Sequence, residues 1–253
     1  VVSIPYLTRV SQAPVITGKK ELEGKHLGFF TEFPTKEGED VEMKVGISFV
    51  DMEGAANNFK QEIASKNFDQ VKKEANELWN KELSRIQISG GTDDEKTIFY
   101  TALYHTMIDP RIYTDVDGRY IGGDYKVHTS DSTFTKHTIF SGWDVFRSQF
   151  PLQTIINPGL VSDELNSLIT LAAESGREYF ERWELLNAYS GCMLGNPALS
   201  VLADAYRKGI RNYDTDKAMR YAINSSNKFT SWKIGYDTTA LCISNTLEYA
   251  YAD

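Results

Sequence analysis

The apolar residues of this 253-residue chain follow two different periods, and the change from one to the other limits the folds it is able to adopt. Between Val41 and Phe49 every second residue is apolar, which is typical of a strand with one buried face. From Ala55 onward apolar residues recur every three or four positions, as in amphipathic helices. We therefore expect a short β region followed by a longer helical region.

The β region is predicted to be the end of a β-sandwich domain, over residues 1–54. A second strand is expected from Leu27 to Phe33, with the polar segment 34–40 joining the two strands as a hairpin. Because two strands rarely hold together alone, the rest of the sheet is expected from upstream sequence or from a partner chain. The chain begins within a strand pattern and stops within a helix pattern, so we expect a fragment of a larger protein.

A helical linker is predicted over residues 55–91. Its apolar residues form one stripe along a helix, at Phe68, Val71, Ala75, Leu78, Trp79 and Leu83. The pair Gly90-Gly91 is expected to end this helix, because glycine is a poor helix former.

A second domain is predicted over residues 92–253. Thr92 and Glu95 have the spacing of a capping box, which predicts a helix running to about Ile108. Long aromatic-rich loops between the later helices favour a ring of helical hairpins over a four-helix bundle, whose connections are short. Those later helices are expected at about 162–174, 197–208, 215–224 and 238–251.

The composition excludes several functions. A hydrophobic content of 41% is typical of a globular chain, and no run approaches the roughly 18 apolar residues of a membrane helix. The 27 basic residues are scattered among 35 acidic ones, for a net charge of -8, which argues against a nucleic-acid partner. A neutral or cationic partner is expected, and the oligomeric state is not predicted.

Metal and thiol chemistry have weak support in the sequence. His105, His128 and His137 lack the helical pairing of a zinc site, so zinc is not expected. Cys192 and Cys242 are expected to be buried free thiols, with a disulfide or a chemical role as the alternatives.

The segment from Asp115 to Gly118 resembles the start of a calcium-binding EF-hand loop, but Lys126 stands where the loop needs a glutamate. We expect a polar turn in which Gly118 takes a positive φ. A loop that faces a sugar or an ion is the alternative.

Two pairs of an indole and a carboxylate, Trp143-Asp144 and Trp183-Glu184, form the candidate site. An aromatic ring packs against the C–H groups of a sugar, and a carboxylate accepts hydrogen bonds from its hydroxyls. One such pair alone is more often a buried tryptophan beside an ion pair, whereas two pairs on one helical scaffold favour a sugar site. Arg147 lies one helical turn after Trp143 and is expected to orient the Asp144 carboxylate, with an ion pair that only holds the loop as the alternative.

Nine segments, taken together and in order, resemble glycoside hydrolase family 92, the calcium-dependent exo-acting α-mannosidases. The resemblance extends from about Leu27 to the end of the chain, and the spacing of the segments makes it specific. The segments are 45–50, 90–92, 99–106, 113–120, 140–147, 182–185, 192–195, 203–206 and 247–251.

The resemblance implies an α+β, mainly α fold: the end of a β-sandwich, a helical linker and part of an (α/α)6 barrel. It implies hydrolysis of terminal α-mannosides in glycans with inversion, by a general acid and a general base on opposite sides of the bond. It also implies a calcium ion that holds sugar hydroxyls, and export by a bacterium to the periplasm or cell surface.

The resemblance carries over the terminal-mannose pocket but not the catalytic groups. The family's acid lies in a Thr-Glu-Gly-Asn motif and its base in an Asp-x-Asp motif, both downstream of the segment at 247–251, so catalytic residues and calcium ligands are not assigned. The residues expected to bind mannose are Trp143, Asp144, Arg147, Trp183 and Glu184. The chain alone is expected to be inactive. The alternatives are a non-catalytic glycan-binding or scaffolding module, and a barrel enzyme that acts on another sugar.

Overall fold

The computed structural model describes residues 2–3, 16–24, 27–28, 30–130, 132–193 and 195–227. The chain divides into two compact units, residues 1–43 and 44–253. In the first unit, β1 (Val2–Ser3) pairs antiparallel with β2 (Leu27–Gly28). The strand predicted at 27–33 is therefore confirmed only at its start, since residues 30–33 lie outside any strand. The helix predicted at 238–251 lies outside the described residues.

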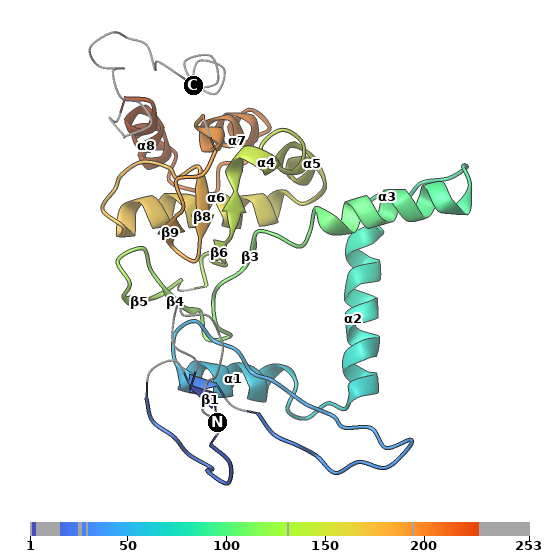
Figure 1. Cartoon of the computed structure of the whole chain (residues 1–253). Helices are drawn as coiled ribbons and strands as arrows, with labels where there is room; N and C mark the ends of the chain where they lie inside the picture. The colour runs from blue at the N-terminus through green and yellow to red at the C-terminus, as the bar shows by residue number, and fades with distance from the viewer. Residues whose placement is uncertain are drawn as a thin grey trace. The chain divides into compact units, whose positions relative to one another are not determined.

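Three helices open the second unit: α1 (Met52–Glu62), α2 (Phe68–Leu83) and α3 (Asp93–His105) (Figure 1). The capping box predicted for α3 is confirmed, because Glu95 N donates to Thr92 Oγ1 (3.2 Å) and Thr92 N donates to Glu95 Oε2 (2.7 Å). In α2 the predicted apolar stripe is present, but none of its residues is buried. Phe68, for example, is 65% exposed.

The strand predicted from Val41 to Phe49 is wrong, since no strand in the described part of the chain pairs with this segment. Its apolar side chains are exposed, whereas Gly46 and Ser48 are partly buried. Gly46 packs so closely on α1 that a Cβ atom there would lie 2.4 Å from Ala55 O. Near α1 the segment thus packs through Gly46 and Ser48 rather than through Val45 and Ile47.

The core of the second unit consists of five helices and a three-stranded antiparallel sheet (Figure 1). The sheet has the order β7 (Phe140–Ser141), β8 (Trp183–Leu185), β9 (Ala188–Tyr189). The helices are α4 (Gly142–Val145), α5 (Gln149–Ile156), α6 (Pro158–Glu174), α7 (Pro197–Arg207) and α8 (Thr215–Asn227). The sequence predicted α6, α7 and α8 but not the short helices α4 and α5.

Proline and glycine define the ends of these helices. Pro158 and Pro197 occupy the first turns of α6 and α7, where the missing N–H is no loss. Gly209 follows α7 with φ +87°, a conformation that favours glycine. Between them, α6 and α7 supply the most deeply buried apolar side chains, at Val161, Leu165 and Ala205.

Two short antiparallel strand pairs belong to the same unit. β3 (Arg111–Ile112) pairs with β6 (His137–Thr138), and β4 (Arg119–Ile121) pairs with β5 (Val127–Thr129). The predicted polar turn precedes β4 and is confirmed, because Gly118 has φ +82° and donates its N–H to Asp115 O.

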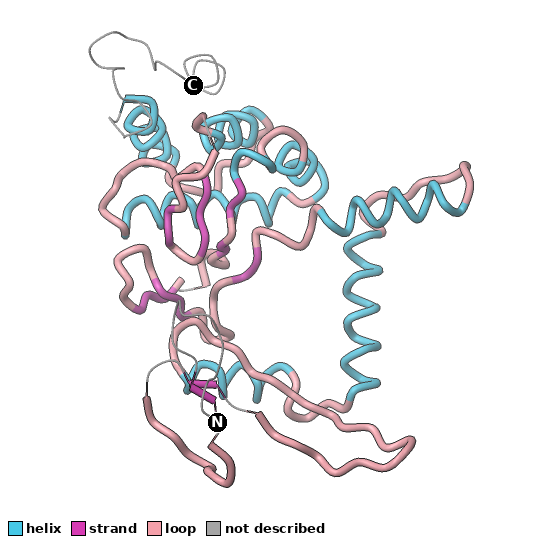
Figure 2. Tube along the Cα trace, viewed as in Figure 1, coloured by secondary structure: helices cyan, strands magenta, loops and turns pink. Residues whose placement is uncertain are grey.

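The strands are few and short beside the helices, as Figure 2 shows, so the prediction of a mainly helical α+β chain is confirmed. Within the described residues, no helix has both the length and the apolar character that a membrane span requires.

Candidate functional site

Strand pairing brings the two tryptophan segments together, although 40 positions separate them in the sequence. Ser141 on β7 pairs with Trp183 on β8, and α4 begins directly after Ser141. Gly142 permits this close turn, because a Cβ atom there would lie 2.5 Å from Arg182 O and 2.8 Å from Pro197 Cγ. The contact between the Asp144 segment and β8 therefore requires glycine at position 142, because a larger side chain does not fit there.

Asp144 and Trp183 are in contact through their side chains. The Ser141 hydroxyl donates to Asp144 Oδ2, and Trp183 Nε1 lies 3.4 Å from the same oxygen. Within the described residues no donor contacts the second oxygen, Oδ1, and the side chain is exposed. The carboxylate is thus held at one oxygen and open to a ligand at the other.

The sequence led us to expect that Arg147 orients the Asp144 carboxylate, but the structure shows no such contact. No ion pair joins these two described residues. The guanidinium instead stacks on the Trp143 ring, with Arg147 Cζ 4.0 Å from the ring centroid, and Arg147 Nε donates to Trp143 O (3.2 Å). A cation over an indole face is a favourable contact. One face of Trp143 is therefore covered by Arg147.

Glu184 is turned away from Asp144 and is 2% exposed. Successive side chains of a strand point to opposite faces, so Trp183 and Glu184 on β8 do not share one pocket. The Glu184 carboxylate accepts hydrogen bonds from Thr138 Oγ1 (2.7 Å), from Ile139 N (2.8 Å) and from Asn187 N. These contacts fix β8 and the turn after it.

Residues 136 and 137, next to Thr138, form hydrogen bonds with α6. Ser167 Oγ accepts a hydrogen bond from His137 N (2.8 Å), and Ser167 O accepts one from Lys136 Nζ (2.8 Å). Burial lowers the pKa of Lys136 to about 8, against the opposing effect of the carboxylates of Glu174 and Glu184. Residues 136–138 thus connect the core helix to the carboxylate of Glu184.

None of the five residues expected to bind mannose lies in the loop after β9. Ser190 N donates to Trp183 O (3.2 Å), so this loop starts beside the candidate site. Cys192 lies in the loop and is exposed, so the prediction of a buried thiol is wrong at this position. Cys242 lies outside the described residues.

The Asp-x-Asp spacing occurs at two places in the chain, and at the first the carboxylates make structural contacts. Asp115 is buried and accepts from Ser48 Oγ (2.6 Å) and Asn58 Nδ2 (2.7 Å), while Asp117 pairs with Arg119 (2.8 Å). These contacts hold the turn against α1 and the segment before it.

At the second place, Asp214 accepts a hydrogen bond from Lys217 N (2.9 Å) in the first turn of α8. This contact lowers the pKa of the Asp214 carboxyl. Asp216 lies in the same turn and lines a groove between α7 and α8. Neither Asp-x-Asp pair adjoins Asp144 in the contacts described, and neither is assigned a catalytic role.

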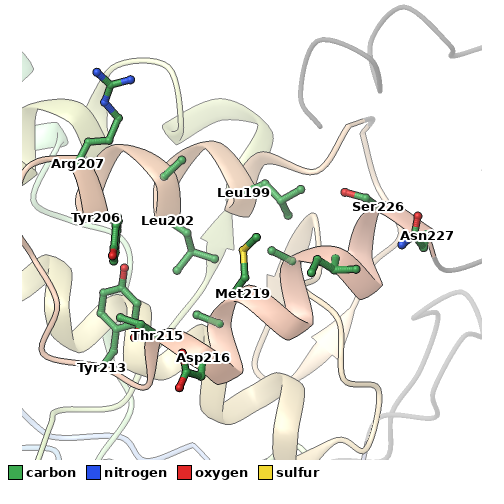
Figure 3. Close-up of a pocket in the computed structure, with 14 residues that line it drawn as sticks. Leu199, Leu202, Tyr206, Arg207, Tyr213, Thr215, Asp216, Met219, Ser226 and Asn227 are labelled. Atoms are coloured by element: carbon green, nitrogen blue, oxygen red, sulfur yellow. The ribbon is translucent and has the colours of Figure 1, made fainter.

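The groove between α7 and α8 has a volume of about 740 Å³ (Figure 3). Its walls are mostly apolar, with Leu199, Leu202 and Met219 among the lining residues, and Tyr206 and Tyr213 close one end. None of the five predicted sugar ligands lines it. The candidate site is instead the exposed surface around Asp144 and Trp183.

No group of three or more His, Cys, Asp or Glu residues in the described part of the chain is arranged to hold a metal ion. Calcium prefers six to eight oxygen ligands. No calcium ligands are therefore assigned among the described residues.

Comparison with known proteins identifies the family. The model of the glycosyl hydrolase family 92 catalytic domain matches residues 54–253. A protein of Arthroderma benhamiae named as an uncharacterized secreted glycosidase is 27% identical over 243 residues, which are 84% of this chain and 27% of that protein.

Solved structures give the same result. An α-mannosidase of this family from Bacteroides thetaiotaomicron has a TM-score of 0.75 and 28% identity, over 81% of this chain and 28% of that one. An inverting mannosidase of the family from the same organism has a TM-score of 0.72 and 32% identity, over 81% and 30% of the two chains. The chain thus spans less than a third of the length of these relatives. This chain belongs to glycosyl hydrolase family 92.

Proposed function

We propose that this chain carries the terminal-mannose pocket of an exo-acting, inverting α-mannosidase, with Asp144 as the principal sugar ligand. The observation that carries the proposal is the geometry of the Asp144 carboxylate, whose Oδ2 is held by Ser141 and Trp183 while Oδ1 is open. A carboxylate fixed before binding loses little freedom when it accepts sugar hydroxyls. Support also comes from a related α-mannosidase whose structure was solved in complex with mannoimidazole.

The surrounding residues are proposed to shape the pocket. Trp183 contributes an apolar wall, because its indole N–H lies against Asp144 and places the ring beside the open oxygen. Trp143 is proposed to contribute less than Trp183, because Arg147 covers one of its faces. Glu184 and Arg147 are proposed to act through these tryptophans, without contact to the sugar.

Hydrolysis with inversion needs an acid and a base on opposite sides of the bond, with room for a water molecule. The Thr-Glu-Gly-Asn motif that supplies the acid in this family does not occur in the sequence. We therefore propose that the chain alone binds mannose but does not release it from glycans. Calcium dependence belongs to the longer protein in this proposal, and no step assigned to the described residues depends on the ion.

Export of the longer protein is also proposed. The support is the name of the Arthroderma benhamiae relative, which describes that protein as secreted. Detection of the protein in the culture medium or periplasm, and not in the cytoplasm, would agree with this part of the proposal.

The proposal is tested by titrating the chain with methyl α-mannoside while following tryptophan fluorescence. We expect saturable quenching, and we expect Asp144→Asn to weaken binding about tenfold or more, because a hydrogen bond to a charged group contributes roughly 1.5–3 kcal/mol. Asp94→Asn, which changes an exposed carboxylate in the first turn of α3, is the control and should bind as the unmodified chain does. Methyl α-glucoside tests selectivity for mannose.

Two results would contradict the proposal. A folded chain that shows no quenching would favour the non-catalytic scaffolding alternative. Release of mannose from an aryl α-mannoside by this chain would show that a complete acid and base pair lies within it.

A further inference from the structure

Arg182 is a buried cation whose side chain points at one loop. It is 3% exposed and immediately precedes β8. Its Nε donates to Tyr189 Oη (2.8 Å), its Nη2 donates to Gly191 O (2.9 Å), and its Nη1 donates to Met193 O. A planar guanidinium presents its donors in a fixed fork, so these contacts hold three loop positions relative to one another.

The backbone of Arg182 supports the other half of the candidate site. Gly142 packs directly on Arg182 O and precedes the Trp143-Asp144 pair. Arg182 is also the residue before Trp183. One residue therefore joins the segment that carries Asp144, the strand that carries Trp183 and the loop after β9.

The loop needs an external restraint, because its backbone is in an unfavourable conformation. Gly191 and Met193 have φ values of +67° and +62°, and a non-glycine residue such as Met193 rarely adopts a positive φ. Both of their carbonyls accept hydrogen bonds from Arg182. Ser190 also restrains the loop, because its N–H donates to Trp183 O (3.2 Å) and its Oγ accepts from Cys192 N (3.3 Å), whereas the guanidinium holds the carbonyls of Gly191 and Met193.

The aromatic residue at the start of the loop adds to the restraint. The Tyr189 ring centroid lies 5.8 Å from Arg182 Cζ and 5.9 Å from Arg177 Cζ, and Arg177 in turn pairs with the buried Glu181. Tyr189 thus contacts two guanidinium groups, and a cation near an aromatic ring is a favourable contact.

We propose that Arg182 is a positioning residue for the sugar pocket, which holds residues 189–193 beside Trp183 so that this loop forms one wall of the pocket. This inference rests on the proposed function, because the wall matters only where a sugar binds. Arg182 itself does not contact the sugar.

Hydrogen exchange and sugar binding, measured on the same chain, test the proposal. In Arg182→Lys a single ammonium replaces the fork and does not satisfy all three acceptors. We expect exchange of the amides in residues 189–193 to rise about tenfold, exchange in α6 to remain unchanged, and the Kd for methyl α-mannoside to rise about tenfold. Arg207→Lys, an exposed cation on α7, is the control and should change neither quantity.

A second, milder variant tests the same proposal in case Arg182→Lys does not fold. Tyr189→Phe removes only the acceptor of Arg182 Nε and retains the ring and the buried charge. We expect changes of about threefold in the same directions.

The outcomes separate the two proposals. Faster loop exchange with an unchanged Kd would overturn the inference, because the loop would not be part of the pocket. Unchanged loop exchange in both variants would overturn it as well. If the unmodified chain binds no mannoside, the proposed function is wrong, and Arg182 has no role in a sugar pocket. The hydrogen-exchange data alone then show whether Arg182 holds the loop.

Discussion

Helices α6 and α2 have nearly equal lengths, 17 and 16 residues, and both carry an apolar stripe, yet their burial is opposite. In α6 nine residues are buried, whereas in α2 none is. The difference lies in the neighbours, because α6 packs against α5, α8 and β6, while the main neighbour of α2 among the described residues is α3. An apolar stripe shows which face of a helix is able to be buried. Whether that face is buried depends on a neighbouring element that packs against it.

The candidate site belongs to the region of α6. Asp144 lies on α4, directly after β7, and Trp183 lies on β8. Residues 136–138 connect β8 to α6. Binding sites need fixed side chains, so we expect this region to tolerate less change than the region of α1 to α3. Four stability predictions follow from the comparison, given from the largest effect to the smallest.

Truncation of a core leucine should have the largest effect. Leu165→Ala in α6, at a fully buried position, is expected to destabilise the protein by about 2–5 kcal/mol through lost burial and a residual cavity. Leu78→Ala in α2, where the side chain is 63% exposed, should cost less than about 1 kcal/mol. Urea unfolding followed by circular dichroism measures both. Equal costs would mean that α2 is covered in solution.

A buried carboxyl in α6 should make stability depend on pH. Burial raises the pKa of Glu164 to about 8, with a smaller contribution from Asp163. The folded state therefore binds a proton that the unfolded state releases near its ordinary pKa of 4.5, so stability is lost as the pH rises from about 4.5 to 8. Glu164→Gln should be more stable than the unmodified chain at pH 8, by on the order of 4 kcal/mol, and equal to it at pH 4.

Thermal unfolding at the two pH values measures the Glu164→Gln effect. Asp163→Asn, at the neighbouring position, is the control and should give a much smaller gain at pH 8. A gain for Glu164→Gln that is the same at both pH values would contradict the assignment to ionisation.

Loss of a helix cap should have a smaller and more local effect. Thr92→Ala removes the capping box of α3 and should destabilise this helix by about 1 kcal/mol. Because Leu103 is the only buried residue of α3 in the structure described, we expect faster hydrogen exchange in its first turn and little change in the core. Thr101→Ala, an exposed position in the same helix, is the control. Equal exchange in the two variants would argue against the cap.

Changes in the exposed apolar segment before α1 should have the smallest effect on stability. Val45 and Ile47 are 54% and 66% exposed, so replacing both by lysine should change the free energy of unfolding by less than about 0.5 kcal/mol. The same change should lower self-association and the binding of a hydrophobic dye, because it removes an apolar patch. A marked loss of stability would show instead that another part of the chain covers this segment in solution.

Much of the helical fold could be predicted, because it depends on local signals. The Thr92–Glu95 capping box, Pro197 at the start of α7 and Gly209 after its end are each recognisable within a few residues of sequence, whereas α6 begins at Pro158 and not at about 162 as predicted. The strand at 41–49 was predicted wrongly because strand formation depends on a distant partner and not on local signals. Its alternation is local, but a strand needs a hydrogen-bonding neighbour, and the sequence pattern does not show one.

The site was predicted in part. The two tryptophan segments do come together, and Asp144 does lie beside Trp183. The assignment of Glu184 to the same pocket was made without a strand predicted at 183–185, and the alternation of that strand separates the side chains of Trp183 and Glu184. The proposed role of Arg182 depends on one hydroxyl and two carbonyl groups seven to eleven positions away, for which a sequence has no signal.

A crystal structure of the chain soaked with mannose tests the central claim most directly. The account predicts a pyranose packed against Trp183, with a hydroxyl within about 3 Å of Asp144 Oδ1. A sugar bound elsewhere, such as in the groove between α7 and α8, or an Asp144 carboxylate that contacts only Ser141, would contradict it.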